Sequence, residues 1–152
     1  MEQIVNVWDY EPGIEAAARF IHGIWGRQEN FNFYLDAISH ATNSATPALP
    51  RFYLLLHENA MIGCSALLTN DLVSRQDLMP WLACLYVAPE FRGRALGARL
   101  LVHGIEEARL LGFRAVYLFT DHAGYYEKYG WQRRDDGYNL FGERSRIYCH
   151  QL

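Results

Sequence analysis

The chain has 152 residues, of which 51% are hydrophobic and 20% charged, so it can bury the core of a domain and is expected to fold. Its 14 Lys and Arg against 17 Asp and Glu leave a net charge of −3, which disfavours nucleic acid as the main partner, since that partner requires a basic face. The three cysteines, Cys64, Cys84 and Cys149, are widely spaced, so we expect neither a disulfide framework nor a metal site.

The first residues, Met1–Ile4, show no charged leader before an apolar stretch, so we expect no signal peptide. No apolar run approaches the length of about 20 residues that spans a bilayer. We therefore expect a cytoplasmic protein with no membrane partner.

The N-terminal third predicts one strand followed by two helices. Residues 4–7 form a short apolar run typical of an edge strand. Apolar residues then recur at helical spacing over 14–25 and, more weakly, over 31–40. Residues 42–50 are rich in Thr, Ser, Ala and Pro, which predicts a loop.

The middle of the chain predicts a hairpin and a buried strand. Strand formers fill 51–57 and 61–68, with Glu58-Asn59 as a tight turn between them. Residues 70–80 are polar and end in proline, which indicates a loop. Residues 81–87 are almost wholly apolar, as in a central strand that is buried on both faces.

The clearest helix covers 95–111, and Gly112 is a natural C-terminal cap. Residues 115–119 then form a second buried strand, so a parallel strand–helix–strand unit is expected. The apolar stripe of this helix consists of Leu96, Leu100, Leu101, Ile105, Ala108 and Leu111.

The C-terminal part predicts a short helix over 122–129, stopped by Gly130, and two strands over 131–135 and 144–150, joined through Gly137 and Gly142. No repeat or linker is apparent. The sequence therefore predicts a single α/β domain with a mixed sheet over residues 1–152.

The junction between the buried strand and the long helix, residues 87–97, has the features of an anion site. Free N–H groups at a helix N-terminus bind phosphate, Gly93 and Gly97 allow close approach, and Arg92 and Arg94 add positive charge. The P-loop and Rossmann patterns are both absent. The residues alone therefore indicate a phosphate or pyrophosphate site, or else a loop glycine with solvated arginines.

The same stretch resembles the coenzyme-binding motif of the GCN5-related N-acetyltransferases, the GNAT family. That pattern, Arg/Gln-x-x-Gly/Ala-x-Gly/Ala, is filled by residues 92–97 and is preceded by Leu85-Tyr86-Val87-Ala88-Pro89-Glu90. Residues 125–131, Tyr-Tyr-Glu-Lys-Tyr-Gly-Trp, are similar to a second family segment and follow the next strand, as in the family. Two motifs in order are far more specific than one glycine-rich loop.

The resemblance implies a fold, a co-substrate and a binding site. The fold is a sheet of six to seven strands with splayed parallel strands, flanked by about four helices. The co-substrate is acetyl-coenzyme A, whose pyrophosphate and pantetheine arm the backbone would hold. The residues implied in this role are Leu85, Tyr86, Val87, Arg92, Gly93, Arg94, Ala95, Leu96, Gly97 and Ala98. Ala95 stands where most members have glycine, and alanine tolerates helical φ and ψ, so we expect the coenzyme still to bind.

The implied activity is transfer of the acetyl group to a primary amine by direct attack in a ternary complex. Tyr126 matches the family's tyrosine that protonates the departing thiolate, a role that suits a phenol with a pKa near 10. Tyr125 and Tyr129 are interpreted as packing residues.

The general base is open, because the family's glutamate position falls near Trp81, which cannot act as a base. Candidates are Asp121 and His122 after a central strand, and Asp71 or Asp77 in the preceding loop. Ordered water is an equal alternative.

The acceptor pocket would be built from residues 24–34, 70–80 and 138–143, whose aromatic and acidic side chains suit a cationic amine with an apolar body. It is equally consistent with a small molecule, an amino acid or a peptide. The aromatics would otherwise fill the core or the surface of a homodimer. Two other readings stay open. One is a non-catalytic acetyl-CoA sensor, and the other is a protein or nucleic-acid module that uses the Arg92–Arg99 patch.

Overall fold

In the computed structural model, which describes residues 1–44 and 48–152, the chain forms a seven-stranded mixed sheet. The strands lie in the order β1-β2-β3-β4-β5-β7-β6, and β4 and β5 are a parallel pair among antiparallel neighbours. This confirms the expected mixed sheet. The strand bounds are β1 Glu2–Asn6, β2 Arg51–His57, β3 Ala60–Leu68, β4 Trp81–Val87, β5 Ala115–Thr120, β6 Gln132–Tyr138 and β7 Arg144–Gln151.

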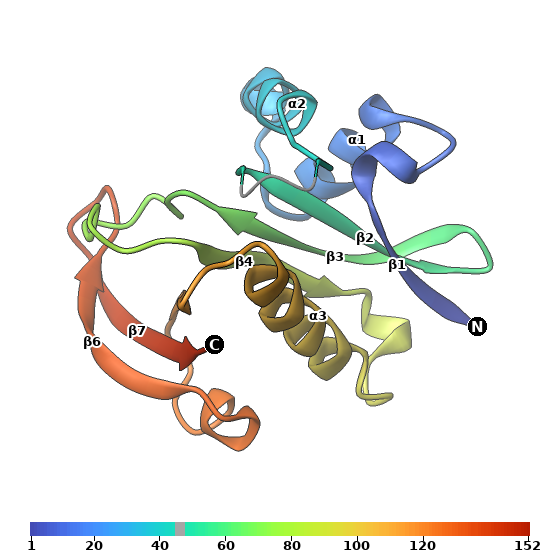
Figure 1. The fold of residues 1–152 in the computed structure, drawn as a ribbon. Coiled ribbons are helices and arrows are strands. Elements are labelled where there is room, and N and C mark those ends of the chain that lie inside the picture. The colour runs from blue at the N-terminus through green and yellow to red at the C-terminus, as the bar shows by residue number, and fades with distance from the viewer. Residues whose placement is uncertain (45–47) are drawn as a thin grey trace.

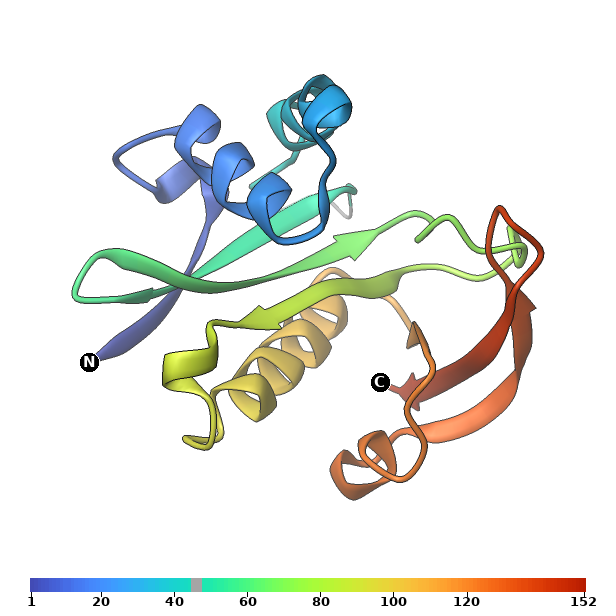
Figure 2. The ribbon, with the colours of Figure 1, turned by 180° about the vertical axis from the view of Figure 1, so that it is seen from behind.

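Helices cover both faces of the sheet (Figures 1 and 2). Helices α1 (Ile14–Trp25) and α2 (Phe31–Ser39) lie on one face, and α3 (Leu96–Leu110) lies on the other. The described residues contain three α-helices where about four were expected, which is consistent with the predicted fold. The helix predicted over 122–129 reduces to the 3-10 turn η4, Tyr126–Tyr129, because Gly124 adopts a φ of +86° that a helix excludes.

The apolar periodicities explain how the helices pack. Helix α1 buries Ala17, Ala18 and Ile21 against the sheet, and α3 buries most of its predicted stripe on the opposite face. Gly112, at φ +89°, follows α3 and donates its N–H to the Arg109 carbonyl, as expected of a helix-ending glycine. These two cores hold the central strands in place between the helices.

The sequence predicts the turn between β2 and β3 correctly, but it misplaces one glycine of the β6–β7 connection. The β2–β3 hairpin turns at Glu58 and Asn59, which take φ values of 49° and 68°, as a tight two-residue turn requires. Gly137 lies inside β6 rather than in the β6–β7 connection. Part of the loop predicted over 42–50, residues 45–47, lies outside the described residues.

Among the described residues, no helix has the length and apolar character needed to cross a membrane. In the same residues, no cluster of three or more His, Cys, Asp or Glu side chains is placed to hold a metal ion.

Candidate active site

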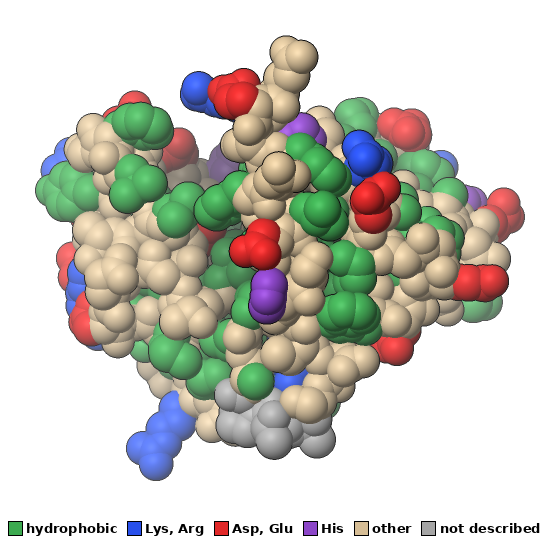
Figure 3. Space-filling view, turned by 90° about the horizontal axis from the view of Figure 1, so that it is seen from above, with side chains coloured by type: hydrophobic (Ala, Val, Ile, Leu, Met, Phe, Trp, Pro, Cys, Tyr) green, Lys and Arg blue, Asp and Glu red, His purple; other side chains and the backbone are tan. Residues whose placement is uncertain are grey.

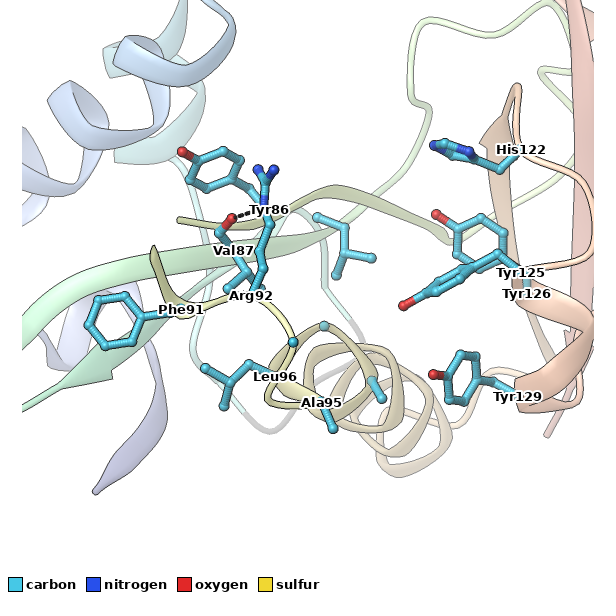
Figure 4. A pocket seen from close by; sticks show the side chains of 14 residues that line it. Tyr86, Val87, Phe91, Arg92, Ala95, Leu96, His122, Tyr125, Tyr126 and Tyr129 are labelled. Atoms are coloured by element: carbon cyan, nitrogen blue, oxygen red, sulfur yellow. Dashed lines mark hydrogen bonds between the residues drawn. The ribbon is translucent and has the colours of Figure 1, made fainter. Parts of the chain in front are cut away.

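A cleft of about 580 Å³ lies between the end of β4 with the start of α3 and the segment 122–129 (Figure 4). It brings together nine of the ten residues that the sequence assigned to the coenzyme, Arg94 being the exception. The tyrosines of the second motif face them from the other side. The lining residues are Leu85, Tyr86, Val87, Phe91, Arg92, Gly93, Ala95, Leu96, Gly97, Ala98, His122, Tyr125, Tyr126 and Tyr129.

One wall of the cleft is an open strand edge, because β4 and β5 pair at Trp81 and Tyr117 and then separate. A bulge in β4 places Cys84 and Leu85 opposite a single β3 residue, with Cys84 at φ 54°. The Ala88 N–H donates to the Ile62 carbonyl on β3 at 2.7 Å. Since N–H groups alternate sides along a strand, those of Leu85 and Val87 point to the open side.

The floor of the cleft is the start of α3. The first helical hydrogen bond runs from the Arg99 N–H to the Ala95 carbonyl, so the N–H groups of Leu96, Gly97 and Ala98 precede the helical ladder. A Cβ atom at Gly93 would meet nothing within 4 Å, so the loop backbone there is open to a ligand. This arrangement of donors fits an anion such as a pyrophosphate.

The backbone conformation of Ala95 differs from the helical one that we expected from the sequence. It is not helical, as its backbone has φ 60° and ψ 21° in the left-handed region. In this region a Cβ costs about 1–2 kcal/mol and glycine costs nothing, which is a physical reason for glycine at the position in most family members. The site therefore tolerates alanine through local strain and not through helical geometry.

The arginines of the motif have separate roles. The Arg92 Nε donates to the Val87 carbonyl at 2.8 Å, which holds its charge at the rim of the cleft (Figure 4). Arg94 lies over the Phe91 ring and does not line the cleft. Arg99 contacts the Glu2 carboxylate and donates to the Glu2 backbone carbonyl in β1. Of the three arginines predicted to form a basic patch, Arg92 alone lines the cleft.

Tyr126 occupies the opposite wall, with its ring directed across the cleft (Figure 4). Burial raises the pKa of its phenol, and a hydrogen bond with Thr120 partly offsets this effect. The side chain is therefore a neutral hydrogen-bond donor at neutral pH, as a general acid requires. Tyr125 and Tyr129, interpreted as packing residues, do pack on one another, with ring centroids 5.4 Å apart, but both also line the cleft.

The two predicted bases after β5 lie apart. His122 lines the outer part of the cleft, and its backbone N–H donates to the Thr120 hydroxyl at 3.1 Å. Asp121 is exposed and lies outside the lining, where its carboxylate accepts from Ser145 and its carbonyl from Arg146. The assignment of either residue as the base stays a prediction.

The alternative base Asp71 lies in a second cavity, of about 150 Å³, between the separated strands. Burial raises the pKa of Asp71 to about 6, and its charge contributes to raising that of Cys84 to about 12. Asp77, the other loop candidate, is exposed and bound to Arg75 at 2.8 Å, which lowers its pKa. Of the two loop acids, only Asp71 lies at a cavity.

The aromatic side chains of the predicted acceptor segments, and Trp81 directly after them, differ in their surroundings. Trp25 contacts the Tyr86 ring, with centroids 6.0 Å apart, and stays partly exposed on the α1 face. Trp81 is fully buried and donates to the Leu78 carbonyl, so it belongs to the core. The side chains of Phe33 and Phe141 are 62% and 84% exposed, so they are not part of the core.

Comparisons with known proteins identify the family and proteins of the same fold. The family model described as the acetyltransferase (GNAT) domain matches residues 48–133. The chain is similar to the uncharacterized N-acetyltransferase YjhQ of Escherichia coli, at 36% identity over 62% of this chain and 53% of that protein. It is also similar to the amino-acid acetyltransferase of Vibrio cholerae, at 29% identity over 59% of this chain.

The chain spans only part of these relatives, 53% of the first and 18% of the second. Among solved structures, a GNAT family acetyltransferase from Elizabethkingia anophelis with acetyl-CoA bound has the same fold. It superposes with a TM-score of 0.69 over 99% of this chain and 98% of the other, at 18% identity.

Proposed function

The chain belongs to the GNAT family of acetyltransferases, and from its site we propose that it transfers an acetyl group from acetyl-coenzyme A to a primary amine by direct attack. The observation that carries the proposal is the position of Tyr126. Its ring lines the cleft opposite the end of β4 and, with Leu85, the opening of the second cavity, whereas the Tyr125 hydroxyl is the one that approaches Gly97 at the start of α3 (Figure 4). A proton donor thus faces the strand edge that would bind the co-substrate.

The residues present fit that co-substrate. The N–H groups of Leu96, Gly97 and Ala98 would hold the pyrophosphate, with the charge of Arg92 at the rim. The open edge of β4 would pair with the amides of the pantetheine arm, as a peptide adds to a sheet edge. In this position the Leu85 N–H is directed to polarise the carbonyl that reacts.

When bound, acetyl-coenzyme A supplies a thioester, whose acyl carbon accepts the amine nitrogen while the carbon–sulfur bond breaks and sulfur leaves with the electron pair. Tyr126 gives its phenolic proton to that sulfur and recovers a proton from water. Because its pKa is raised, the Tyr126 phenol stays protonated until negative charge develops on the departing sulfur. The amine nitrogen must lose a proton, which requires a base.

Direct attack is supported by the state of the nearest thiol. Cys84 lies beside Leu85 in the second cavity, of about 150 Å³, which we call the inner cavity. Burial and the charge of Asp71 raise the pKa of the Cys84 thiol to about 12. A thiol with that pKa is almost wholly protonated at neutral pH and is a poor nucleophile. An acetylated cysteine is therefore disfavoured as an intermediate.

The test is a thiol-release assay over a broad amine panel, run on the wild-type protein and Tyr126→Phe, with calorimetry for acetyl-CoA affinity. We expect amine-dependent thiol release by the wild type. In Tyr126→Phe, kcat should fall about 100-fold or more with little change in the affinity for acetyl-CoA. Binding of acetyl-CoA without thiol release across the whole panel would count against acetyl transfer. Full activity of Tyr126→Phe would refute only the role of Tyr126.

A further inference from the structure

The inner cavity meets the coenzyme cleft at two residues. Leu85 and Tyr126 line both, so the cavity opens onto the point where the thioester would lie under the proposed function. It is the space left between β4 and β5 beyond their pairing at Trp81 and Tyr117. Its lining residues are Asp71, Leu82, Ala83, Cys84, Leu85, Leu101, Leu118, Phe119 and Tyr126.

The loop that carries Asp71 is fixed in place. The Asn70 side chain accepts from the Val73 N–H at 2.9 Å and donates to the Val73 carbonyl at 3.1 Å, which closes a tight turn around Asp71. Two hydrogen bonds between Ser74 and Tyr138, at 2.9 and 3.0 Å, attach the loop to β6. The backbone on either side of Asp71 is therefore fixed by two separate sets of hydrogen bonds.

Asp71 is the only charged side chain in the described lining of this cavity. Apart from Asp71, the titratable side chains in the lining are the Cys84 thiol and the Tyr126 phenol, which are neutral at pH 7, and burial raises both pKa values further. The remaining lining side chains are apolar, and within the described part of the chain the lining contains no Lys, Arg or His. A half-buried carboxylate without a cation beside it is costly unless a ligand supplies the positive charge.

We propose that the acceptor is a terminal alkylamine whose amine-bearing carbon carries no carboxylate, and that Asp71 binds its ammonium group and then takes its proton. The inference rests on the proposed acetyl transfer and names its acceptor class and its base. A cavity of about 150 Å³ takes about six non-hydrogen atoms, which suits the reacting end of a slender chain.

The proton balance follows from the geometry. The bound ammonium gives one proton to the Asp71 carboxylate, and the neutral nitrogen forms the new carbon–nitrogen bond. The nitrogen then loses its second proton, to water, as Tyr126 protonates the departing sulfur. Asp71 returns its own proton to water when the amide leaves, which restores the starting enzyme.

The same geometry disfavours an α-amino acid, although a similar protein is an amino-acid acetyltransferase. An α-carboxylate would lie one carbon from the nitrogen that Asp71 binds, so two negative charges would share a small apolar space. No cationic side chain in the described lining would compensate it. Figure 3, which looks onto the face that carries α1 and α2, shows this face hollowed beside the helices, with apolar, acidic and histidine side chains at the edge of the hollow.

The first experiment compares amines with their own α-carboxylated forms in the thiol-release assay. Phenethylamine is paired with phenylalanine, 3-methylbutylamine with leucine, and agmatine with arginine, because none of these amino acids carries a second primary amine. For the pair that reacts fastest, we expect kcat/KM to be at least about 100-fold higher for the amine. An amino acid that reacts as fast as its amine would overturn the proposal. If no amine of any kind reacts, acetyl transfer itself is refuted, and the acceptor class with it.

The second experiment tests Asp71 directly. Asp71→Asn should lower kcat for the best amine at least about 100-fold while acetyl-CoA affinity stays within twofold. Asp71→Glu should recover part of the rate because it restores a carboxylate. Asp77→Asn, in the same loop but exposed and bound to Arg75, is the matched control and should keep full activity. Undiminished turnover of folded Asp71→Asn, with loss in Asp121→Asn or His122→Gln, would overturn the assignment.

Discussion

Trp81, the first residue of β4, pairs with Tyr117 of β5, and beyond this pair the two strands diverge. The Trp81 ring is fully buried, 5.8 Å from the Tyr117 ring, and its indole donates to the Leu78 carbonyl at 2.7 Å. The closed end of the parallel pair is thus locked by packing. The open end leaves the strand edge and the inner cavity on which the proposed chemistry depends.

Replacing Ala95 by glycine should stabilise the protein. Ala95 has φ 60°, where a Cβ is strained, so Ala95→Gly should raise the free energy of unfolding by about 1 kcal/mol. Urea denaturation would measure the change. Ala98→Gly, in the right-handed first turn of α3, is the matched control and should instead lower stability by about 0.5–1 kcal/mol. Loss of stability in Ala95→Gly would show that residue 95 is not held in the left-handed region.

Replacing Asp71 by asparagine should stabilise the protein at neutral pH. The folded pKa of Asp71, about 6, exceeds the value of about 3.9 in an unfolded chain. Folding therefore favours the protonated carboxyl group. The stability that this preference contributes is fully present below about pH 4 and is lost as pH rises through 6. Asp71→Asn removes this loss, so we expect a gain of about 2 kcal/mol at pH 7.5 that vanishes near pH 4.

Denaturant unfolding of the Asp71→Asn variant at the two pH values would check this, with Asp77→Asn as the control. The pKa of Asp77 is lowered by Arg75, so its contribution is present above its unfolded pKa and lost as pH falls. Asp77→Asn should therefore lose stability at pH 7.5. A gain in both variants would show a general effect of removing negative charge.

The sequence predicts the coenzyme side of the site well because that side is local. A strand, a turn and a helix N-terminus lie within residues 81–97, and a spacing pattern fixes which backbone groups face the cleft. Tyr126 follows from a second motif in the expected place. Periodicity does not reveal the left-handed backbone of Ala95, because that conformation depends on the turn that joins β4 to α3.

The acceptor side is harder to predict because it is assembled from distant segments. Asp71 was one of four candidate bases, and only the separation of β4 from β5 brings it to the same cavity as Tyr126. Asp121, favoured for its place after a central strand, instead accepts from Ser145 of β7 and lies outside the cleft. Pairing across the sheet, which spacing along the chain does not show, separates the two aspartates.

Adding a methyl group at Gly137 should disturb the loop that carries Asp71. A Cβ at Gly137 would lie 2.8 Å from Ile147 Cδ1, closer than such atoms pack, and 3.1 Å from Val73 Cγ1, which is a tight contact. Gly137→Ala should therefore cost about 1–3 kcal/mol of stability and raise KM for the amine more than KM for acetyl-CoA. Gly23→Ala, at an open position in α1, is the control and should be neutral or stabilising. Equal changes in both KM values would place the loop outside the acceptor site.

Cys84 should remain unacetylated during turnover. Its pKa of about 12 leaves almost no thiolate at pH 7.5, so incubation with acetyl-CoA alone should add no acetyl mass to the folded protein. For the same reason, iodoacetamide should alkylate Cys84 much more slowly in the folded protein than in protein unfolded by urea, as peptide mass spectrometry would show. An acetyl group on Cys84 that disappears when the amine is added would establish a covalent route. Steady-state patterns give an independent check, since direct attack requires both substrates bound together and intersecting double-reciprocal lines, whereas a covalent route gives parallel ones.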